Sequence, residues 1–268
     1  MSWDIGAAML TDVGCHRSTN EDAGCIVRPA HPAVGQTRGL LAIVADGMGG
    51  HAGGEVASGL AVDTVRRAYF DRPGSPAQAL KEAVEEANAA IFARAQRDAD
   101  LSGMGTTCVA LALCGDEACV ATVGDSRVYL IRGGRIYQMS VDDSAVSDMV
   151  SRGVISGEEA RHHQDRNVIL RALGTHATVT ISVWEQPFPV REDDAFLLCS
   201  DGLTDLVADP EILAASVDVP EADACRALVD LARARGGFDN ITVAMLRLRR
   251  AHVTRTEVPA TRESPVTS

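Results

Sequence analysis

Four short acidic segments of the chain, most of them containing glycine, place an aspartate beside an apolar, strand-like run. In chain order they are NED (20–22), ADGMGGH (45–51), GDSR (124–127) and SDGL (200–203), with FDN (238–240) following the last of them. An aspartate where a strand stops holds its carboxylate at the rim of a sheet. Several carboxylates converging there would repel one another unless cations lay between them. Such oxygen ligands suit hard divalent ions, Mg²⁺ or Mn²⁺, better than Zn²⁺, so the pattern predicts a carboxylate metal centre.

Each segment also has an ordinary explanation as a turn. The glycines after Asp46 permit a tight turn, in which a backbone carbonyl can also point at a metal. Asp201 repeats this arrangement, while Asp125 and Asp239 could form simple Asx turns. One such turn would need no further account. Several in series, each beside an apolar strand-like run, are better explained by one shared site.

An arginine precedes the first acidic segment. Arg17 lies four residues before Glu21 in the sequence CHRSTNED. A guanidinium group can bind a phosphate with two parallel hydrogen bonds. The alternative, a solvent-exposed loop arginine, stays open from this position alone.

Composition limits the classes of partner. The 268 residues are 46% hydrophobic and 23% charged, which is ordinary for a globular protein. A net charge of −12 argues against nucleic acids and anionic membranes as partners. No apolar run approaches the ~20 residues of a membrane span, and the first residues do not resemble a signal peptide. We therefore expect no membrane insertion and a cytoplasmic location. The seven cysteines form no CxxC pair and are expected to be reduced and packed.

Hydrophobic periodicity predicts many short strands and a few helices. Strands are expected at 3–11, 23–28, 39–45, 106–114, 118–123, 127–132, 135–138, 179–184, 195–199 and 241–248, helices at 53–70, 76–98, 210–217 and 221–235, a loop at 29–38, and a polar helical segment at 144–174. Hairpin strands with paired helices indicate an α+β fold with two antiparallel sheets covered by helices. We expect one domain over 1–250 and a polar, disordered tail over 251–268.

Seven motifs together resemble a known family. TDVGCHRSTNED, VADGMGGH, MGTT, VGDSR, RNVILRALG, LLCSDGL and DNITV, in this order, resemble the metal-dependent serine/threonine protein phosphatases of the 2C type in their compact bacterial form. The resemblance covers about residues 3–248. Each motif alone is weak, but the ordered set is specific. It implies a central sandwich of two antiparallel β-sheets flanked by pairs of α-helices (αββα), with the metal centre at one end of the sandwich.

The resemblance implies two or three Mn²⁺ or Mg²⁺ ions and a set of ligands. Asp46 would bridge two metals, and the Gly47 carbonyl would help to hold one of them. Asp201 and Asp239 would bind the other. Glu21 would act on a metal through water.

Further residues would complete the site by the same resemblance. Asp125, together with Asp201, would hold a weaker third metal. Asp22 and Asn240 would support the ligands. Arg17 matches the arginine that binds the substrate phosphate, so Arg17 and Asp46 are the expected catalytic residues.

The implied reaction is hydrolysis of phosphoserine and phosphothreonine in proteins by direct attack of a metal-bound water. Two ions about 3.5–4 Å apart lower the pKa of a shared water. The metal charge and Arg17 would neutralise the phosphoryl oxygens without a covalent enzyme intermediate. The identity of the general acid stays open, because Met48 cannot donate a proton. His51 and water are the candidates.

The resemblance also implies partners in signalling. The expected substrates are a serine/threonine kinase of the eukaryotic-like bacterial type and the targets of that kinase, with the phosphatase a monomer. Residues 141–174 correspond to a mobile flap that affects substrate choice. Two alternatives stay open. A non-enzymatic scaffold could use the same cleft, although the intact aspartates argue against it. A hydrolase of small phosphate esters would be separated from a protein phosphatase by comparing a phosphopeptide with a small ester.

Overall fold

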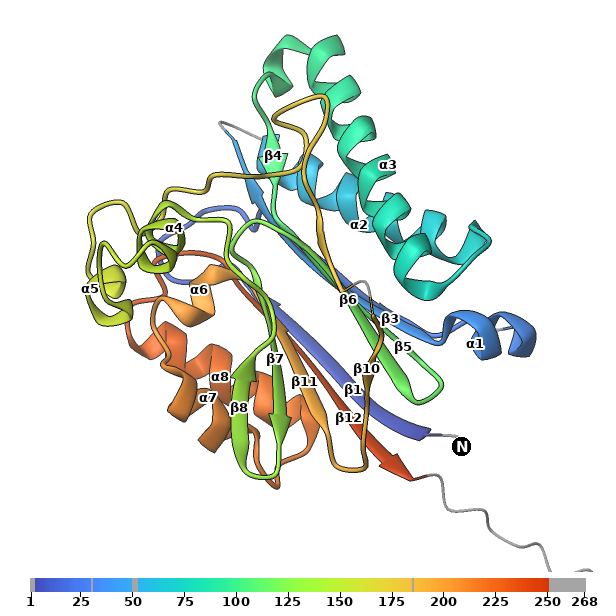
Figure 1. The fold of residues 1–268 in the computed structure, drawn as a ribbon. Coiled ribbons are helices and arrows are strands. Elements are labelled where there is room, and N and C mark those ends of the chain that lie inside the picture. The colour runs from blue at the N-terminus through green and yellow to red at the C-terminus, as the bar shows by residue number, and fades with distance from the viewer. Residues whose placement is uncertain (1–2, 30, 50–52, 185, 251–268) are drawn as a thin grey trace, which may run out of the picture.

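The computed structural model describes residues 3–29, 31–49, 53–184 and 186–250. Two antiparallel sheets lie face to face between layers of helices (Figure 1). The first sheet has the strand order β1-β12-β11-β7-β8, and the second has the order β10-β6-β5-β3-β2, with β4 on β3 and β9 on β6. This arrangement confirms the predicted α+β class and its two antiparallel sheets.

The strands of the first sheet are β1 (Trp3–Asp12), β7 (Arg127–Arg132), β8 (Arg135–Gln138), β11 (Ala195–Cys199) and β12 (Ile241–Arg250). Those of the second sheet are β2 (Asp22–Val27), β3 (Leu40–Met48), β4 (Gly105–Thr106), β5 (Cys108–Cys114), β6 (Glu117–Val123), β9 (Ser182–Val183) and β10 (Phe188–Pro189). The long antiparallel pairing of β1 with β12 joins the two ends of the domain, from Trp3↔Arg250 to Asp12↔Ile241.

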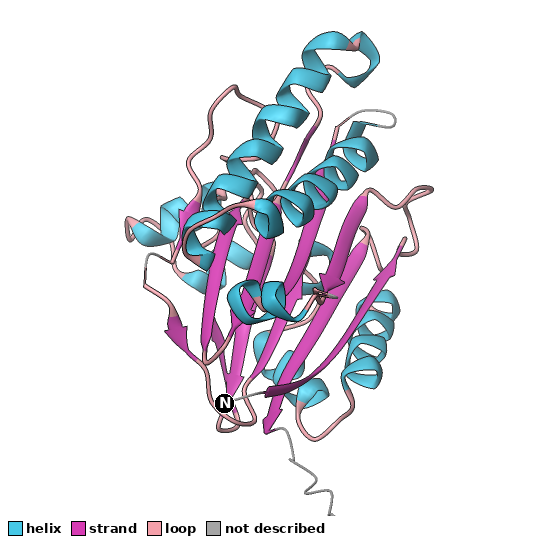
Figure 2. Cartoon of the chain, turned by 90° about the vertical axis from the view of Figure 1, so that its right-hand side faces the viewer, coloured by secondary structure: helices cyan, strands magenta, loops and turns pink. Residues whose placement is uncertain are grey.

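Helices cover the outer face of each sheet (Figure 2). The pair α2 (Gly53–Asp71) and α3 (Pro76–Arg97) packs on the second sheet, and α7 (Asp209–Ser216) and α8 (Glu221–Ala234) pack on the first. Ser75 caps α3 by accepting a hydrogen bond from the backbone N–H of Gln78. Every helix in the described ranges is too short or too polar to span a lipid bilayer.

The central strands are buried on both faces, which explains their continuous apolar sequences. In β3, Leu41 and Ile43 face the helices α2 and α3, whereas Ala42 and Val44 face the other sheet. This alternation follows from the two-residue period of a strand. The strand therefore runs rigidly between two cores towards the acidic residues at its end.

Two local predictions at the front of the chain were wrong. The strand β3 does not stop at Asp46 but continues to Met48, because Gly47 and Met48 pair with β4. The expected loop at 29–38 contains α1 (Pro32–Arg38). Proline is favourable in a first helical turn, where its missing N–H costs nothing. The Arg38 side chain also donates to the carbonyls of Gly74 and Arg72, which fixes the end of this helix.

The segment 144–174 is less helical than predicted. It holds only α4 (Ala145–Ser151) and α5 (Gly157–Arg161), capped by Ser144 and Ser156, and the rest follows turns. We call residues 141–174 the flap. The predicted strand at 179–184 is reduced to β9, and two further short helices are η1 (Ala99–Leu101) and α6 (Asp201–Thr204).

The remaining expectations concern cysteines and boundaries. The seven cysteines are free thiols, and Cys108, Cys119, Cys199 and Cys225 are buried, as predicted for reduced, packed residues. The boundary at residue 250 coincides with the end of β12 but stays a prediction. The predicted disordered tail, 251–268, lies outside the described residues.

The close approach of α6 to β12 can be tested by adding one methyl group. A Cβ on Gly202 would overlap the backbone oxygen of Asn240. Gly202→Ala should therefore lower the free energy of unfolding by about 1–3 kcal/mol. At Gly59, in α2, an added Cβ meets nothing within 4 Å. Gly59→Ala should instead stabilise by roughly 0.5–1 kcal/mol through helix propensity. Urea denaturation checks both, and equal effects would contradict the packing argument.

Candidate metal centre

The acidic segments predicted from the sequence meet at one end of the sandwich. Asp22, at the start of β2, is the cross-strand partner of Asp46 in β3. Asp201 is the first residue of α6, directly after β11, and Asp239 comes just before β12. Asp125 lies in the turn between β6 and β7. Both sheets thus deliver carboxylates to the same place, although the residues come from distant parts of the chain.

The pKa values of two of these carboxyl groups are strongly raised. Burial, followed by the charge of Asp201, raises the pKa of Asp46 well above its ordinary value. Burial, followed by the charge of Asp125, does the same to Asp201. Both groups are therefore costly to ionise, and a cation between the carboxylates would reduce this repulsion.

Asp22 and Asp125 are also buried next to other acids. Burial raises the pKa of Asp22 to about 6, although Thr242 and Ser200 donate hydrogen bonds of 2.7 and 2.8 Å to its Oδ2. Burial, with the charge of Asp142 next in importance, raises the pKa of Asp125 to about 7. Both carboxylates are therefore costly to ionise in the protein by itself.

Three carboxylate oxygens at this end of the sandwich have no hydrogen-bond partner among the described residues. They are Asp22 Oδ1, Asp125 Oδ1 and Asp201 Oδ1, all of them buried. A buried oxygen without a partner carries an uncompensated desolvation penalty. A hard divalent cation would remove that penalty, and carboxylate oxygens are the donors that Mg²⁺ and Mn²⁺ prefer. The donor set therefore fits the predicted ions.

The carboxylates are not yet arranged as a finished metal site. Within the described residues, no three acidic, histidine or cysteine side chains are grouped so that they could hold a metal ion as they stand. Asp239 is engaged by Arg17. Metal binding at Asp239 would have to change that ion pair. The ligand roles of Asp46, Gly47, Asp201, Asp239, Glu21 and Asp125 stay predictions.

Arg17 lies directly beside the candidate ligands. Its Nη2 donates to Asp239 Oδ2 at 2.7 Å, and the two side chains are 48% and 38% exposed. Its hydrogen bond with Asp239 raises the pKa of Arg17, and the charges of Glu21 and Asp46 act in the same direction. Because an exposed pair of this kind is weak, the guanidinium can leave Asp239 for a stronger anion.

Asn240 holds the loop that carries Arg17. Its Oδ1 accepts a hydrogen bond of 2.8 Å from the backbone N–H of Glu21, and its Nδ2 donates to the carbonyls of Val13 and Thr19 at 3.0 Å. Its side-chain amide thus ties residues 13–21 to the segment before β12. The supporting role of Asn240 in metal binding stays a prediction.

The glycine at position 47 is required by its neighbours. A Cβ there would overlap the backbone oxygens of Gly54 and Glu21, and the Gly47 N–H donates to the Glu21 carbonyl at 3.2 Å. Burial raises the pKa of Glu21, while the charge of Arg17 lowers it.

Met48 is partly buried at the end of β3. His51, the other residue considered as a general acid, lies outside the described residues.

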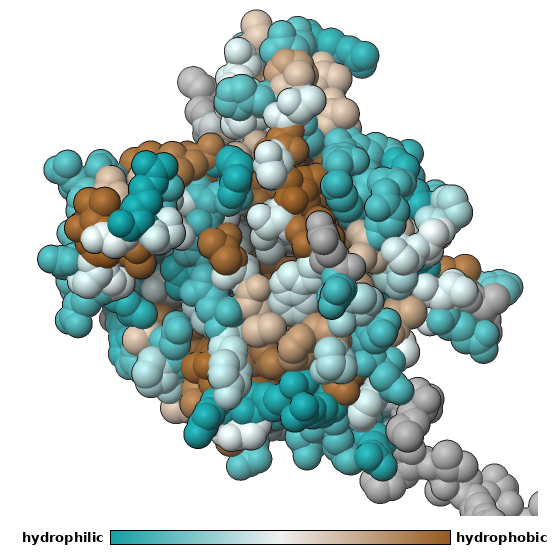
Figure 3. Space-filling model, in the orientation of Figure 1, coloured by the Kyte–Doolittle hydropathy of each residue, from teal (hydrophilic) through white to brown (hydrophobic). Residues whose placement is uncertain are grey.

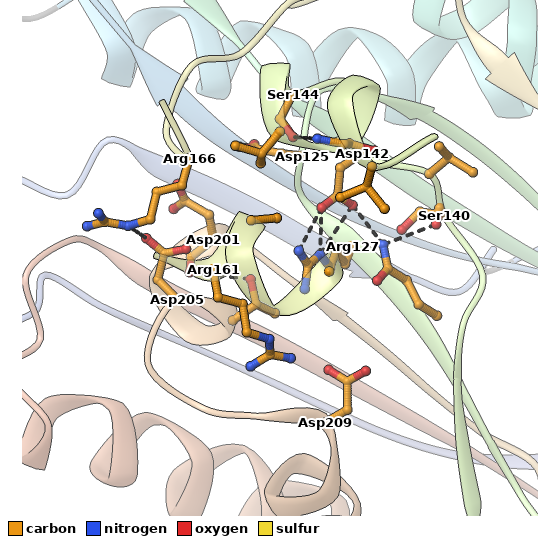
Figure 4. Close-up of a pocket in the computed structure, with 18 of the residues that line it drawn as sticks. Asp125, Arg127, Ser140, Asp142, Ser144, Arg161, Arg166, Asp201, Asp205 and Asp209 are labelled. Atoms are coloured by element: carbon orange, nitrogen blue, oxygen red, sulfur yellow. Dashed lines mark hydrogen bonds and ion pairs between the residues drawn. The ribbon is translucent and has the colours of Figure 1, made fainter. Parts of the chain in front are cut away.

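A cavity of about 750 Å³ lies between this site and the flap (Figure 4). Asp125 and Asp201 line one part of it, and Val146, Val150 and Arg161 of the flap line another. Apolar flap side chains gather on the surface nearby (Figure 3). Those that are exposed are Val141, Val150, Val154, Val168 and Leu170.

Sequence analysis missed the acid–base pairs around this cavity. Arg127 donates to Asp142 Oδ2 from Nη2 at 2.7 Å and from Nε at 2.9 Å (Figure 4). Arg166 Nε lies 4.0 Å from Asp205 Oδ2. Arg127 was noted only as the last letter of the GDSR motif. The consecutive aspartates of VDDS (141–144), at the start of the flap, are the signal that could have identified Asp142.

The raised pKa values predict an unusual pH dependence for the protein in chelator. The pKa of Asp125 is about 7 and that of Asp22 about 6, against about 4 in an unfolded chain. The folded state therefore binds more protons, so stability should fall as the pH rises from about 4 towards 8. Asp125→Asn should lose less stability than wild type between pH 5 and pH 8 in thermal denaturation. Equal losses would show that Asp125 does not titrate in this range.

Comparisons with known proteins agree with the geometry. The family model described as protein phosphatase 2C matches residues 29–230. The serine/threonine protein phosphatase PstP of Mycobacterium tuberculosis is 41% identical over 241 residues, which cover 89% of this chain but 44% of PstP. The serine/threonine phosphatase Stp of Listeria monocytogenes is 36% identical over 249 residues, 90% of this chain and 94% of Stp. The chain thus spans less than half the length of PstP.

Solved structures of bacterial phosphatases share the fold. The crystal structure of M. tuberculosis PstP superposes with a TM-score of 0.82 at 38% identity, over 92% of this chain and 99% of that one. The PstP catalytic domain in complex with two manganese ions gives a TM-score of 0.79 at 37% identity, over 93% and 100%. With the family model matching most of the chain and this architecture shared, the chain belongs to the protein phosphatase 2C family.

Proposed function

We propose that the chain is a metal-dependent protein-serine/threonine phosphatase that hydrolyses phosphate monoesters of serine and threonine in proteins. The observation that carries the proposal is the gathering of carboxylates beside an exposed arginine, three of them with a buried oxygen that has no hydrogen-bond partner in the described ranges. Such a site holds divalent cations next to a phosphate-binding group. The relatives named above are serine/threonine phosphatases, which supports the same activity here.

The proposed ligands follow from the residues at the end of the sandwich. Asp46, the Gly47 carbonyl, Asp201, Asp239 and Glu21 would hold two Mn²⁺ or Mg²⁺ ions, and a third would lie at Asp125. The PstP complex with two manganese ions supports the first two of these ions. Bound ions would lower the pKa of a water molecule and withdraw charge from the phosphoryl oxygens.

The protein's own residues then have separate tasks. Arg17 exchanges Asp239 for the substrate phosphate, so one movement frees a metal ligand and binds an anion. Asn240 keeps the Arg17 loop and Glu21 at a fixed distance from Asp239 through its three hydrogen bonds. Asp22, held by Ser200 and Thr242, keeps further negative charge behind Asp46. Because Met48 has no proton to donate, the leaving serine or threonine takes its proton from water.

The proposed substrates are phosphorylated proteins, a serine/threonine kinase and its targets among them. The cavity beside the flap, with apolar and arginine side chains, offers contacts to a peptide that a small phosphate ester could not use. We also propose that residues 1–250 form the catalytic domain, acting as a monomer in the cytoplasm. A scaffold without activity is disfavoured because every predicted metal-binding carboxylate is present.

Phosphate release from a phosphothreonine peptide tests the proposal directly. Release should need Mn²⁺ or Mg²⁺, stop in chelator, and fall by a factor of about 100 or more in Asp201→Asn, which removes a carboxylate from the metal centre. Asp63→Asn, on the exposed face of α2, is the matched control and should keep full activity. Release in chelator, or an active Asp201→Asn, would refute the metal-dependent mechanism.

Removing the arginine tests phosphate binding separately. Arg17→Ala should lower kcat/KM for the phosphopeptide by about 10- to 100-fold, the value of a charge-assisted hydrogen bond. Arg17→Lys keeps the charge but loses the two-pronged geometry, so it should fall between wild type and Arg17→Ala. Steady-state kinetics of the three proteins, at saturating metal, gives the order. An unchanged kcat/KM in Arg17→Ala would exclude Arg17 from phosphate binding.

A further inference from the structure

A buried aspartate outside the proposed ligand set joins the flap to the turn that carries Asp125. The side chain of Asp143 is 2% exposed, and it accepts hydrogen bonds from the Gly124 N–H, at 3.1 Å, and from Arg171. Gly124 immediately precedes Asp125, and Arg171 lies near the end of the flap. One carboxylate therefore connects the candidate metal centre with both ends of the flap.

The backbone of Asp143 repeats the same connections. Its N–H donates to the Gly124 carbonyl at 2.9 Å, and its carbonyl accepts from the Leu170 N–H at 2.7 Å. The two arms of the flap continue to pair beyond this point, since the Ala145 N–H donates to the Val168 carbonyl at 2.8 Å. The neck of the flap and the Asp125 turn are thus one hydrogen-bonded unit with Asp143 at its centre.

Among the described residues, Asp143 has a single ion-pair partner, Arg171. The Arg171 side chain is itself 44% exposed. A buried carboxylate needs such a partner, because its desolvation is otherwise uncompensated. If the flap moves Arg171 away, the hydrogen bond that the Asp143 carboxylate accepts from the Gly124 N–H must change as well.

The Asp125 turn is in turn connected to the centre of the site. Ser126 Oγ lies 2.7 Å from Thr107 Oγ1, which accepts the backbone N–H of Asp46 at 2.9 Å. These hydrogen bonds would therefore transmit a displacement of the turn to β3, the strand that carries Asp46. A second link to the flap runs from Leu173 to Thr106 of β4, the strand that pairs with the end of β3, and because backbone groups form it, changing Asp143 does not alter it.

We propose that Asp143 is a positioning residue, whose ion pair with Arg171 couples the order of the flap to metal binding at Asp125. Coupling of this kind is reciprocal: metal that fixes the Asp125 turn also fixes the flap, and an ordered flap strengthens metal binding. The inference rests on the proposed function only in taking Asp125 as a metal ligand. It does not require turnover.

Trypsin cleavage of the flap measures this coupling without an activity assay. The exposed Arg161 lies in α5 and provides a cleavage site. In the wild-type full chain, saturating Mn²⁺ should slow cleavage after Arg161 by about fivefold or more relative to chelator, the lower end of typical coupling. In Asp143→Asn the rates with and without Mn²⁺ should be equal. A merely structural role would speed both rates by the same factor and keep their ratio.

The flap itself supplies a matched control. Asp148 pairs with Arg152 at 3.0 Å on α4, is 40% exposed, and belongs to the same flap without contacting Gly124. Asp148→Asn should therefore keep the wild-type ratio of cleavage rates. Calorimetric titration with Mn²⁺ should show its weakest site weakened by about fivefold or more in Asp143→Asn and unchanged in Asp148→Asn.

Arg171→Gln provides a second, independent variant. It removes the ion pair but keeps the carboxylate that accepts the Gly124 N–H, so it should also bring the ratio of rates close to one. If Asp143→Asn does not fold, Arg171→Gln decides. A wild-type ratio in both folded variants would overturn the proposal, as would wild-type cleavage indifferent to bound Mn²⁺. Metal-dependent protection in a protein that releases no phosphate would support the coupling while refuting the proposed function.

Discussion

Repulsion among buried carboxylates governs the active end of this molecule. Asp22, Asp46, Asp125 and Asp201 come from different strands and turns, and burial raises the pKa of each. Within the part of the chain that the structure describes, three of their oxygens have no hydrogen-bond partner. A folded chain accepts such a cost only where the rest of the structure holds the groups in place. The two sheets do so, since each ends rigidly at this point and neither can move away without opening a core.

The surroundings of the site limit the cost by giving neighbouring acids a specific arginine. Asp142 is paired with Arg127, Asp143 with Arg171, and Asp239 with Arg17. The carboxylates of these pairs differ in exposure, and the difference matches the role that we propose. The pairs with buried carboxylates, at Asp142 and Asp143, hold the flap and its neck, whereas the Arg17–Asp239 pair, exposed on both sides, is weak enough to be exchanged for a phosphate.

The flap connects the chemistry with the substrate because it shares hydrogen bonds with both. Its neck is fastened to the Asp125 turn, and its apolar and basic side chains line the cavity beside Asp125 and Asp201. A segment so placed can contact a protein around its phosphorylated residue while remaining sensitive to the metals. This arrangement gives a physical reason why the flap, which lies between β8 and β9, could influence both substrate choice and metal affinity.

The sequence by itself determined the fold class, the main strands and helices, and the identity of the acidic residues. Apolar runs of fixed period specify buried strands, and an ordered set of motifs specifies a family, because both depend on local residue types. Only the tertiary structure decided that β3 continues past Asp46, that residues 32–38 form a helix, and that burial raises the pKa values of Asp46 and Asp201. It alone revealed Asp143 as the connection to the flap. These features depend on pairing partners far away in the chain, β4, Gly74, Asp201 and Arg171, whose proximity no local pattern encodes.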